Sequence, residues 1–143
     1  MSAPVDPPPL SILPPPTVRI VALVAAFEAF AVLVVAGVVI AARKDADLKW
    51  ALATAAYFVA LTVLIAAVSK GLFQGRRWAR TPALVINLIV LLVGFYLAFP
   101  SGQLAPGLAM MVLGGASVGL LVSKSSSEWI KSFPPLFGPM ADQ

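Results

Sequence analysis

The sequence predicts an all-α membrane protein in which four transmembrane helices lie between proline-rich, extended N- and C-terminal tails. Four apolar runs of spanning length follow one another at residues 18–42, 48–68, 82–99 and 104–122. Hydrophobic residues make up 60% of the 143 residues and charged residues 11%, whereas a soluble domain carries about 45–50% and about 25%. Because so few charges cannot coat a water-facing surface, we expect lipid to surround one compact four-helix unit.

The first 17 residues form an arm that contains seven of the 13 prolines. Proline fixes φ and lacks an N–H group, so the arm is expected to be extended, close to polyproline II. It does not have the pattern of a signal peptide, because no basic region precedes an apolar core.

The first two spans have recognisable ends. Residues 18–42 would form a helix about 37 Å long. This exceeds the hydrocarbon core of about 30 Å, so the helix must tilt or protrude. Asp47 is a suitable N-cap for the span at 48–68. Lys70 and Gly71 follow that span, and a cation and a glycine favour a helix C-terminus.

The last two spans are also bounded by helix signals. Thr81 and Pro82 are typical of an N-cap and a first helical position. Residues 100–102 favour a tight turn, and Pro106 lies in the first turn of the fourth span, where a missing N–H does little harm. Residues 123–143 form the C-terminal tail. Helix is expected in each span because backbone groups in lipid must be satisfied within the segment, and the alternating segments of a porin-like barrel are not seen.

The distribution of cations predicts the orientation. With four spans, both termini and the loop between the second and third spans lie on one side of the membrane. That side holds seven cations, namely Arg19, Lys70, Arg76, Arg77, Arg80, Lys124 and Lys131. The other side holds three, namely Arg43, Lys44 and Lys49. The positive-inside rule therefore predicts a multi-pass cell-membrane protein with both termini in the cytoplasm.

The sequence contains no cysteine and no histidine. It therefore excludes disulfides, thiolate zinc sites and c-type haem attachment, and it lacks the commonest metal ligand and general acid–base. No serine nucleophile elbow, phosphate-binding loop or paired carboxylate is present. We expect no enzymatic activity, no cofactor, no metal site and no small-molecule substrate. Nucleic-acid binding is disfavoured because the net charge of +4 is small and gathers near the membrane boundaries.

Glu28 is the intramembrane polar residue that stands out, because it lies ten residues into the first span. A charged residue at that depth costs on the order of 2.5–3.5 kcal/mol, so an intramembrane carboxylate is a functional candidate. One interpretation is a proton relay or an ion-binding group. The other is a protonated or hydrogen-bonded glutamate that holds helices together, or one that pairs with an arginine of a partner subunit. The candidate partners within the chain are Tyr57, Thr62, Asn87 and Ser117.

Gly115 and Gly119 form a GxxxG pair in the fourth span, and small residues at this spacing let helices approach closely. The pair could dock a partner chain or pack within the bundle. Similar pairs of small residues occur at Ala22/Ala26, Ala25/Ala29 and Ala56/Ala60.

Residues 71–81 form a basic loop with aromatic anchors, and its densest part is Arg76, Arg77, Trp78 and Arg80. These residues could bind anionic lipid head groups, at about 1 kcal/mol per cation near the surface. They could also serve only to fix the topology.

The two tails hold ten of the 13 prolines but are not simply polar. Disordered linkers are usually poor in large apolar residues, so stiff apolar tails are expected to lie along another protein. The alternative is a disordered tail at the lipid head groups. The apolar side chains are Leu10, Ile12, Leu13, Trp129, Ile130, Phe133, Leu136, Phe137 and Met140.

Residues 74–83, with the sequence Gln-Gly-Arg-Arg-Trp-Ala-Arg-Thr-Pro-Ala between the second and third spans, resemble a pattern in small four-helix integral membrane proteins of actinobacteria. That group brings no settled activity. The proline-rich tails are not part of its pattern. In build, the chain is also similar to accessory subunits of the cytochrome bcc–aa3 respiratory supercomplex.

These observations favour a non-catalytic accessory or stabilising subunit of a larger membrane complex, with the actinobacterial respiratory chain as the assembly that the resemblance implies. Its expected partners are membrane lipids and other membrane protein subunits. One alternative is a small transporter or ion-conducting oligomer that uses Glu28. A second is a free-standing membrane protein that binds anionic lipid through residues 71–81.

Overall fold

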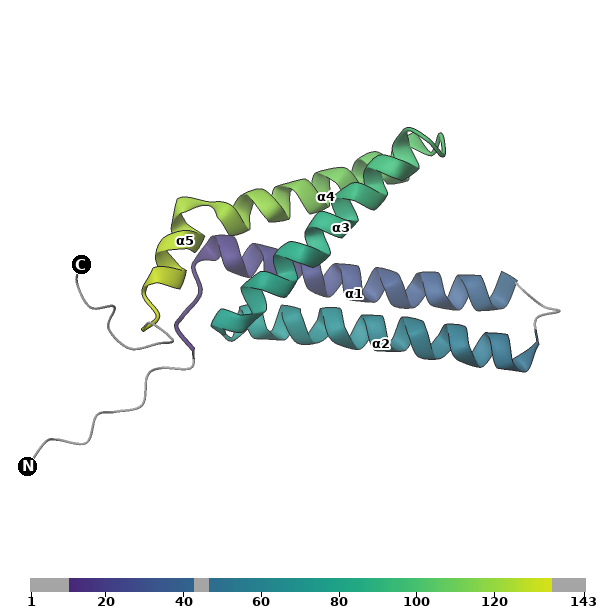
Figure 1. Cartoon of the computed structure of the whole chain (residues 1–143), viewed down its shortest axis with the longest axis horizontal. Coiled ribbons are helices and arrows are strands. Elements are labelled where there is room, and N and C mark those ends of the chain that lie inside the picture. Colours follow the sequence, from purple (N-terminus) through teal and green to yellow (C-terminus); the bar gives the residue numbers. More distant parts are fainter. Residues whose placement is uncertain (1–10, 43–46, 135–143) are drawn as a thin grey trace, which may run out of the picture.

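The computed structural model describes residues 11–42 and 47–134, and four long helices dominate it (Figure 1). These are α1 (Pro16–Ala42), α2 (Leu48–Phe73), α3 (Arg80–Ala98) and α4 (Leu104–Val122). All four are long and apolar enough to cross a membrane, so the predicted all-α, four-span membrane fold is confirmed. The predictions for residues 1–10, 43–46 and 135–143, including an extended arm and tail, lie outside the described residues.

Three helices begin or end outside the predicted apolar runs. Helix α3 runs from Arg80 to Ala98, where the sequence predicts 82–99, so Thr81 and Pro82 lie within its first turn. Helix α1 begins at Pro16, because the carbonyl of Pro15 accepts the amides of Val18 and Arg19 at 3.0 and 3.2 Å, and proline at a first helical position loses no hydrogen bond. Helix α2 continues past Lys70 to Phe73. Ser69 is buried and its hydroxyl donates to the carbonyl of Ala22 at 2.7 Å, so this polar residue packs against α1 and does not end the helix. Lys70 beside it is exposed.

The helices form two antiparallel hairpins, α1–α2 and α3–α4, that diverge from one end of the molecule (Figure 1). The end where they meet is called the closed end below, and the opposite end the open end. The main core lies at the closed end and draws side chains from every helix, namely Val18, Val21, Ala22, Val68, Leu72, Ala79, Ala83, Leu121, Trp129 and Phe133. Since the hairpins diverge, they cannot both stand parallel to the membrane normal. Helix α1 has 27 residues, about 40 Å, so the α1–α2 hairpin can take the larger tilt.

The structure adds a short helix, α5 (Lys124–Lys131), within the segment that the sequence predicts as an extended tail. The hydroxyl of Ser123 caps its first turn by accepting the amide of Ser126 at 3.5 Å. On its inner face Trp129 is buried, and its ring contacts Phe133 edge-on with 5.4 Å between ring centroids. An isolated helix of eight residues is marginal in water, so this packing against the core stabilises α5.

Candidate functional site

The N-terminal arm, the α2–α3 connection and α5 meet at the closed end. The amide of Ile12 donates to the carbonyl of Gly75 at 3.1 Å, and the indole N–H of Trp129 donates to the carbonyl of Ile12, also at 3.1 Å. A short antiparallel bridge joins Ser11 to Arg76. Segments more than 100 residues apart in the sequence are therefore joined by a hydrogen bond from a side-chain indole to a backbone carbonyl.

Several apolar residues of the two tails are buried by this arrangement within the chain itself. Ile12, Trp129, Ile130 and Phe133, which the sequence suggests for docking on another protein, pack against the core of this chain. Leu13 is exposed, and Leu10, Leu136, Phe137 and Met140 lie outside the described residues. The described parts of both tails are thus ordered by contacts within the chain.

Two of the three arginines in the basic loop bind backbone carbonyls. The guanidinium of Arg80 donates twice to the carbonyl of Leu121, at 2.7 and 3.2 Å. That carbonyl lies in the last turn of α4, where a cation is favoured. Arg77 donates to the carbonyl of Pro134 at 3.2 Å. By contrast, Arg76 and Trp78 are exposed, so only these two of the four highlighted residues face outward.

Glycines of α4 divide between an inner and an outer face. Gly107 and Gly114 are buried against α3, and a Cβ atom on Gly114 would lie 2.7 Å from the carbonyl oxygen of Asn87. The predicted GxxxG pair lies outside this close contact, since Gly115 is half-buried and Gly119 is exposed. A Cβ on Gly115 would meet only Leu91, at 3.6 Å, and one on Gly119 would meet nothing within 4 Å. The pair is therefore not used for close packing within the described chain.

Of the three predicted alanine pairs, only Ala25/Ala29 is buried as a pair. Ala22, Ala25 and Ala29 are buried in α1, and Ala25 and Ala29 pack with Ile65 of α2. Their small side chains let the first hairpin close, as small residues do in membrane helices. Ala26, Ala56 and Ala60 are exposed.

Glu28 lies where the two hairpins begin to separate. Val21 and Val35 lie on the same face of α1, two turns before and two turns after Glu28. The exposed fraction of the side chain rises along this face, from 0% at Val21 through 8% at Glu28 to 51% at Val35. Both carboxylate oxygens are buried and have no hydrogen-bond partner among residues 11–42 and 47–134. The described residues contain no group of three or more acidic, histidine or cysteine side chains that could hold a metal ion.

None of the partners suggested for Glu28 bonds to it. Tyr57 is 66% exposed. The hydroxyl of Thr62 is buried and has no partner in the described chain. The amide N–H of Asn87 donates to the carbonyl of Ala83 at 2.9 Å, while Ser117 is buried in α4. Glu28 therefore does not join the hairpins through a hydrogen bond.

We expect the substitution Glu28→Leu to raise the melting temperature of the purified chain in detergent, whereas Glu28→Gln should leave it nearly unchanged. A buried polar group without a partner costs about 1–3 kcal/mol, and leucine removes it at similar volume. The measurement is thermal unfolding of the three proteins in one detergent. A lower melting temperature for the leucine variant would show that the carboxyl group stabilises the bundle.

Comparison with known proteins does not assign the chain to a family. No protein-family model matches the chain, and searches of the curated proteins and of the solved structures find no match.

Proposed function

We propose that the chain is a non-catalytic accessory or stabilising subunit of a larger membrane protein complex. The observation that carries this proposal is the outer face of α4, where the glycines of a helix-packing pattern are not used for close packing within the described chain. Gly119 is exposed, and Gly115 is half-buried beside Leu91. Gly115 and Gly119 lie on one line along α4 with three exposed apolar residues. Leu108 and Val112 precede the glycines on this line, and Val122 follows them. The spacing of this line alternates between four and three residues, as in the seam of two packed helices.

A line of this kind is suited to a second transmembrane helix. Within a bilayer, association depends on close van der Waals packing, because lipid tails are as apolar as leucine. The two glycines leave a shallow surface, and Val112 and Val122 border it. A partner helix could therefore approach α4 more closely than lipid chains would. The non-catalytic part of the proposal rests on the lack of histidine and cysteine in these 143 residues.

The assembly that we propose is the actinobacterial respiratory chain. Its support is the resemblance of residues 74–83 to small actinobacterial membrane proteins, together with a build similar to accessory subunits of the cytochrome bcc–aa3 supercomplex. Affinity purification of the tagged chain from its native membrane, followed by mass spectrometry, tests this choice. Recovery of cytochrome subunits would support it, and recovery of a different complex would replace it.

The substitution Gly119→Leu tests the docking face. We expect the wild-type chain to migrate in a large assembly after gentle detergent extraction, and the Gly119→Leu variant to migrate alone while keeping its helix content and melting temperature. A Cβ atom at position 119 would meet no atom of the described chain within 4 Å, so the bundle should tolerate leucine there. The leucine side chain would, however, block the approach of a partner helix.

Gly37→Leu is the matched control, because Gly37 is also a helical glycine whose added Cβ would meet nothing within 4 Å. It lies on α1, so this variant should remain in the large assembly. Migration of the wild-type chain as a monomer in native gels would count against the whole proposal. Retention of the Gly119→Leu variant in the complex would count against this face.

We also propose that the closed end faces the cytoplasm, as the excess of cations predicts. The chain has no cysteine, so single cysteines can be introduced and labelled without background. Ser125 on α5 and Ser101 in the α3–α4 connection are both exposed. We expect an impermeant maleimide added to intact cells to label the Ser101→Cys variant and not the Ser125→Cys variant. The reverse result would invert the orientation.

A further inference from the structure

We propose that the closed end binds anionic phospholipids through a group of cations that the fold itself does not use. These are the exposed residues Arg19, Lys70, Arg76, Lys124 and Lys131, called the outer cations below. The site is additional to the proposed docking face on α4 and does not depend on it. It also differs from the loop of residues 71–81 that the sequence suggests, because it includes α5 and leaves two arginines out.

The structure separates the seven cations of the closed end into two groups. The guanidinium groups of Arg77 and Arg80 are occupied by the carbonyls of Pro134 and Leu121. The side chains of the outer cations make no hydrogen bond or ion pair with any described residue. Their charges are therefore available to an external anion, whereas those of Arg77 and Arg80 are committed to the fold.

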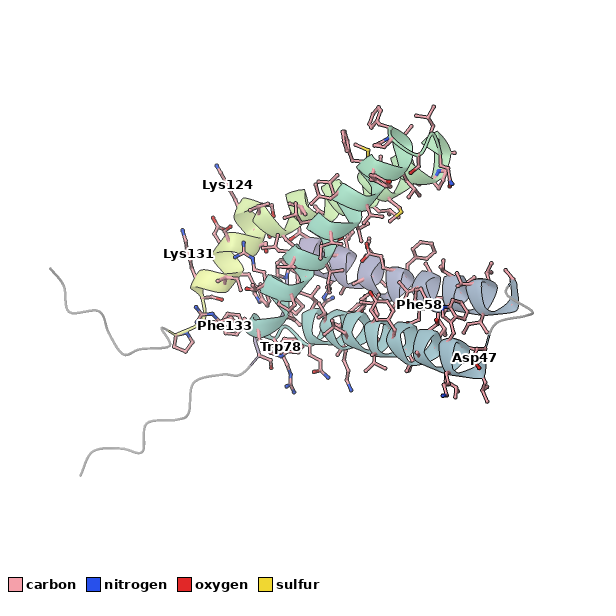
Figure 2. All side chains as sticks on the ribbon, turned by 45° about the vertical axis from the view of Figure 1, so that its right-hand side comes forward. Asp47, Phe58, Trp78, Lys124, Lys131 and Phe133 are labelled. Carbon is pink, nitrogen blue, oxygen red and sulfur yellow. The ribbon has the colours of Figure 1, made fainter. Side chains whose placement is uncertain are left out.

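The charge at this end is not balanced by acids. Among the described residues, Glu128 is the only acidic side chain at the closed end, and it faces outward on α5 between Lys124 and Lys131. It makes no ion pair with either lysine within the described chain. Figure 2 shows that Lys124 and Lys131 project away from the bundle, on the side opposite Trp78. The two lysines of α5 thus lie on another side of the closed end than Trp78, which is two residues from Arg76 in the sequence. The outer cations therefore do not converge on one point.

Apolar residues at the same end show that these cations lie at the level of the lipid head groups. Phe73, the last residue of α2, is 42% exposed, and Trp78 in the α2–α3 connection is 52% exposed. They lie three and two residues from Arg76 in the sequence. An exposed tryptophan at the end of a spanning helix is typical of the membrane interface. Cations at that height lie beside lipid phosphates, so a lipid head group is the anion they meet. Separate cations on different sides of the closed end suit several lipids around the bundle better than one soluble phosphate compound.

The test compares phosphatidylglycerol with phosphatidylcholine as ligands of the full chain. The wild-type protein and the double variant Lys124→Gln/Lys131→Gln are placed in phosphatidylcholine nanodiscs with a trace of spin-labelled lipid of either kind. We expect the wild-type chain to prefer phosphatidylglycerol and the double variant to lose a large part of that preference, by up to about five-fold per removed cation. Raised salt should reduce the wild-type preference, because exposed charges are screened.

Two controls make the result specific. Lys49→Gln removes an exposed cation at the open end and should leave the preference intact. Arg77→Gln removes a cation used by the fold, so it should lower the melting temperature equally in both lipids and keep the preference. Equal preference in the wild-type chain and the double variant would overturn the proposal, and so would a wild-type preference that salt does not change.

Discussion

The substitution Gly107→Ala is expected to destabilise the α3–α4 hairpin strongly, although it adds a single methyl group. A Cβ atom on Gly107 would overlap the backbone nitrogen of Ala98 and lie 2.7 Å from both its Cα and Cβ atoms. Backbone atoms cannot move aside as a flexible side chain can, so the two helices must separate. Overpacking of this kind typically costs about 1–3 kcal/mol. The measurement is thermal or denaturant unfolding of the purified chain in detergent.

Gly37→Ala is the control that isolates packing from helix propensity. Both glycines are helical, and alanine favours a helix over glycine by about 1 kcal/mol. Since a Cβ on Gly37 would meet nothing within 4 Å, Gly37→Ala should leave the melting temperature unchanged or raise it. The two variants are thus expected to differ in sign. If Gly107→Ala were as stable as Gly37→Ala, the close contact between α3 and α4 would be wrong.

The contrast between inner and outer glycines also shows where sequence reasoning ends. The spans could be predicted because length and apolarity alone decide membrane crossing. The small-residue pattern selected Gly115 and Gly119, but the close contacts between α3 and α4 use Gly94, Gly107 and Gly114. A spacing of four identifies a face that can pack closely. It does not say which face turns inward, because that depends on the register between α3 and α4.

The roles of the cations at the closed end also could not be predicted from the sequence. Sequence grouped Arg76, Arg77 and Arg80 because they are neighbours in one loop. Their roles differ because the carbonyl that Arg80 binds belongs to Leu121, which is 41 residues away and unrecognisable as a partner from local sequence. Helix α5 is similar. Its cap, Ser123, is a visible signal for a helix start, but the packing of Trp129 that stabilises so short a helix is a tertiary effect.

The substitution Gly75→Ala is expected to detach the N-terminal arm from the closed end. Gly75 has φ of +67°, a conformation that costs other residues roughly 1–2 kcal/mol. In addition, a Cβ atom there would overlap the carbonyl oxygen of Ile12 and lie 3.0 Å from the Cδ of Pro14. The carbonyl of Ile12 also accepts the indole N–H of Trp129. Displacing it therefore loses the contacts of the arm with both the α2–α3 connection and α5.

Gly102→Ala separates the two causes. Gly102 has nearly the same φ, +68°, but a Cβ on it would meet nothing within 4 Å. The loss of stability in the Gly102→Ala variant should reflect the backbone conformation alone. Hydrogen exchange read at the amide of Ile12, which bonds to Gly75 in the wild-type chain, should become fast in Gly75→Ala and stay slow in Gly102→Ala. If both variants kept this amide protected, the arm would not depend on Gly75. The closed end would then be held by the packing of Trp129 and Phe133 against the core, with the backbone bonds as a consequence of that packing.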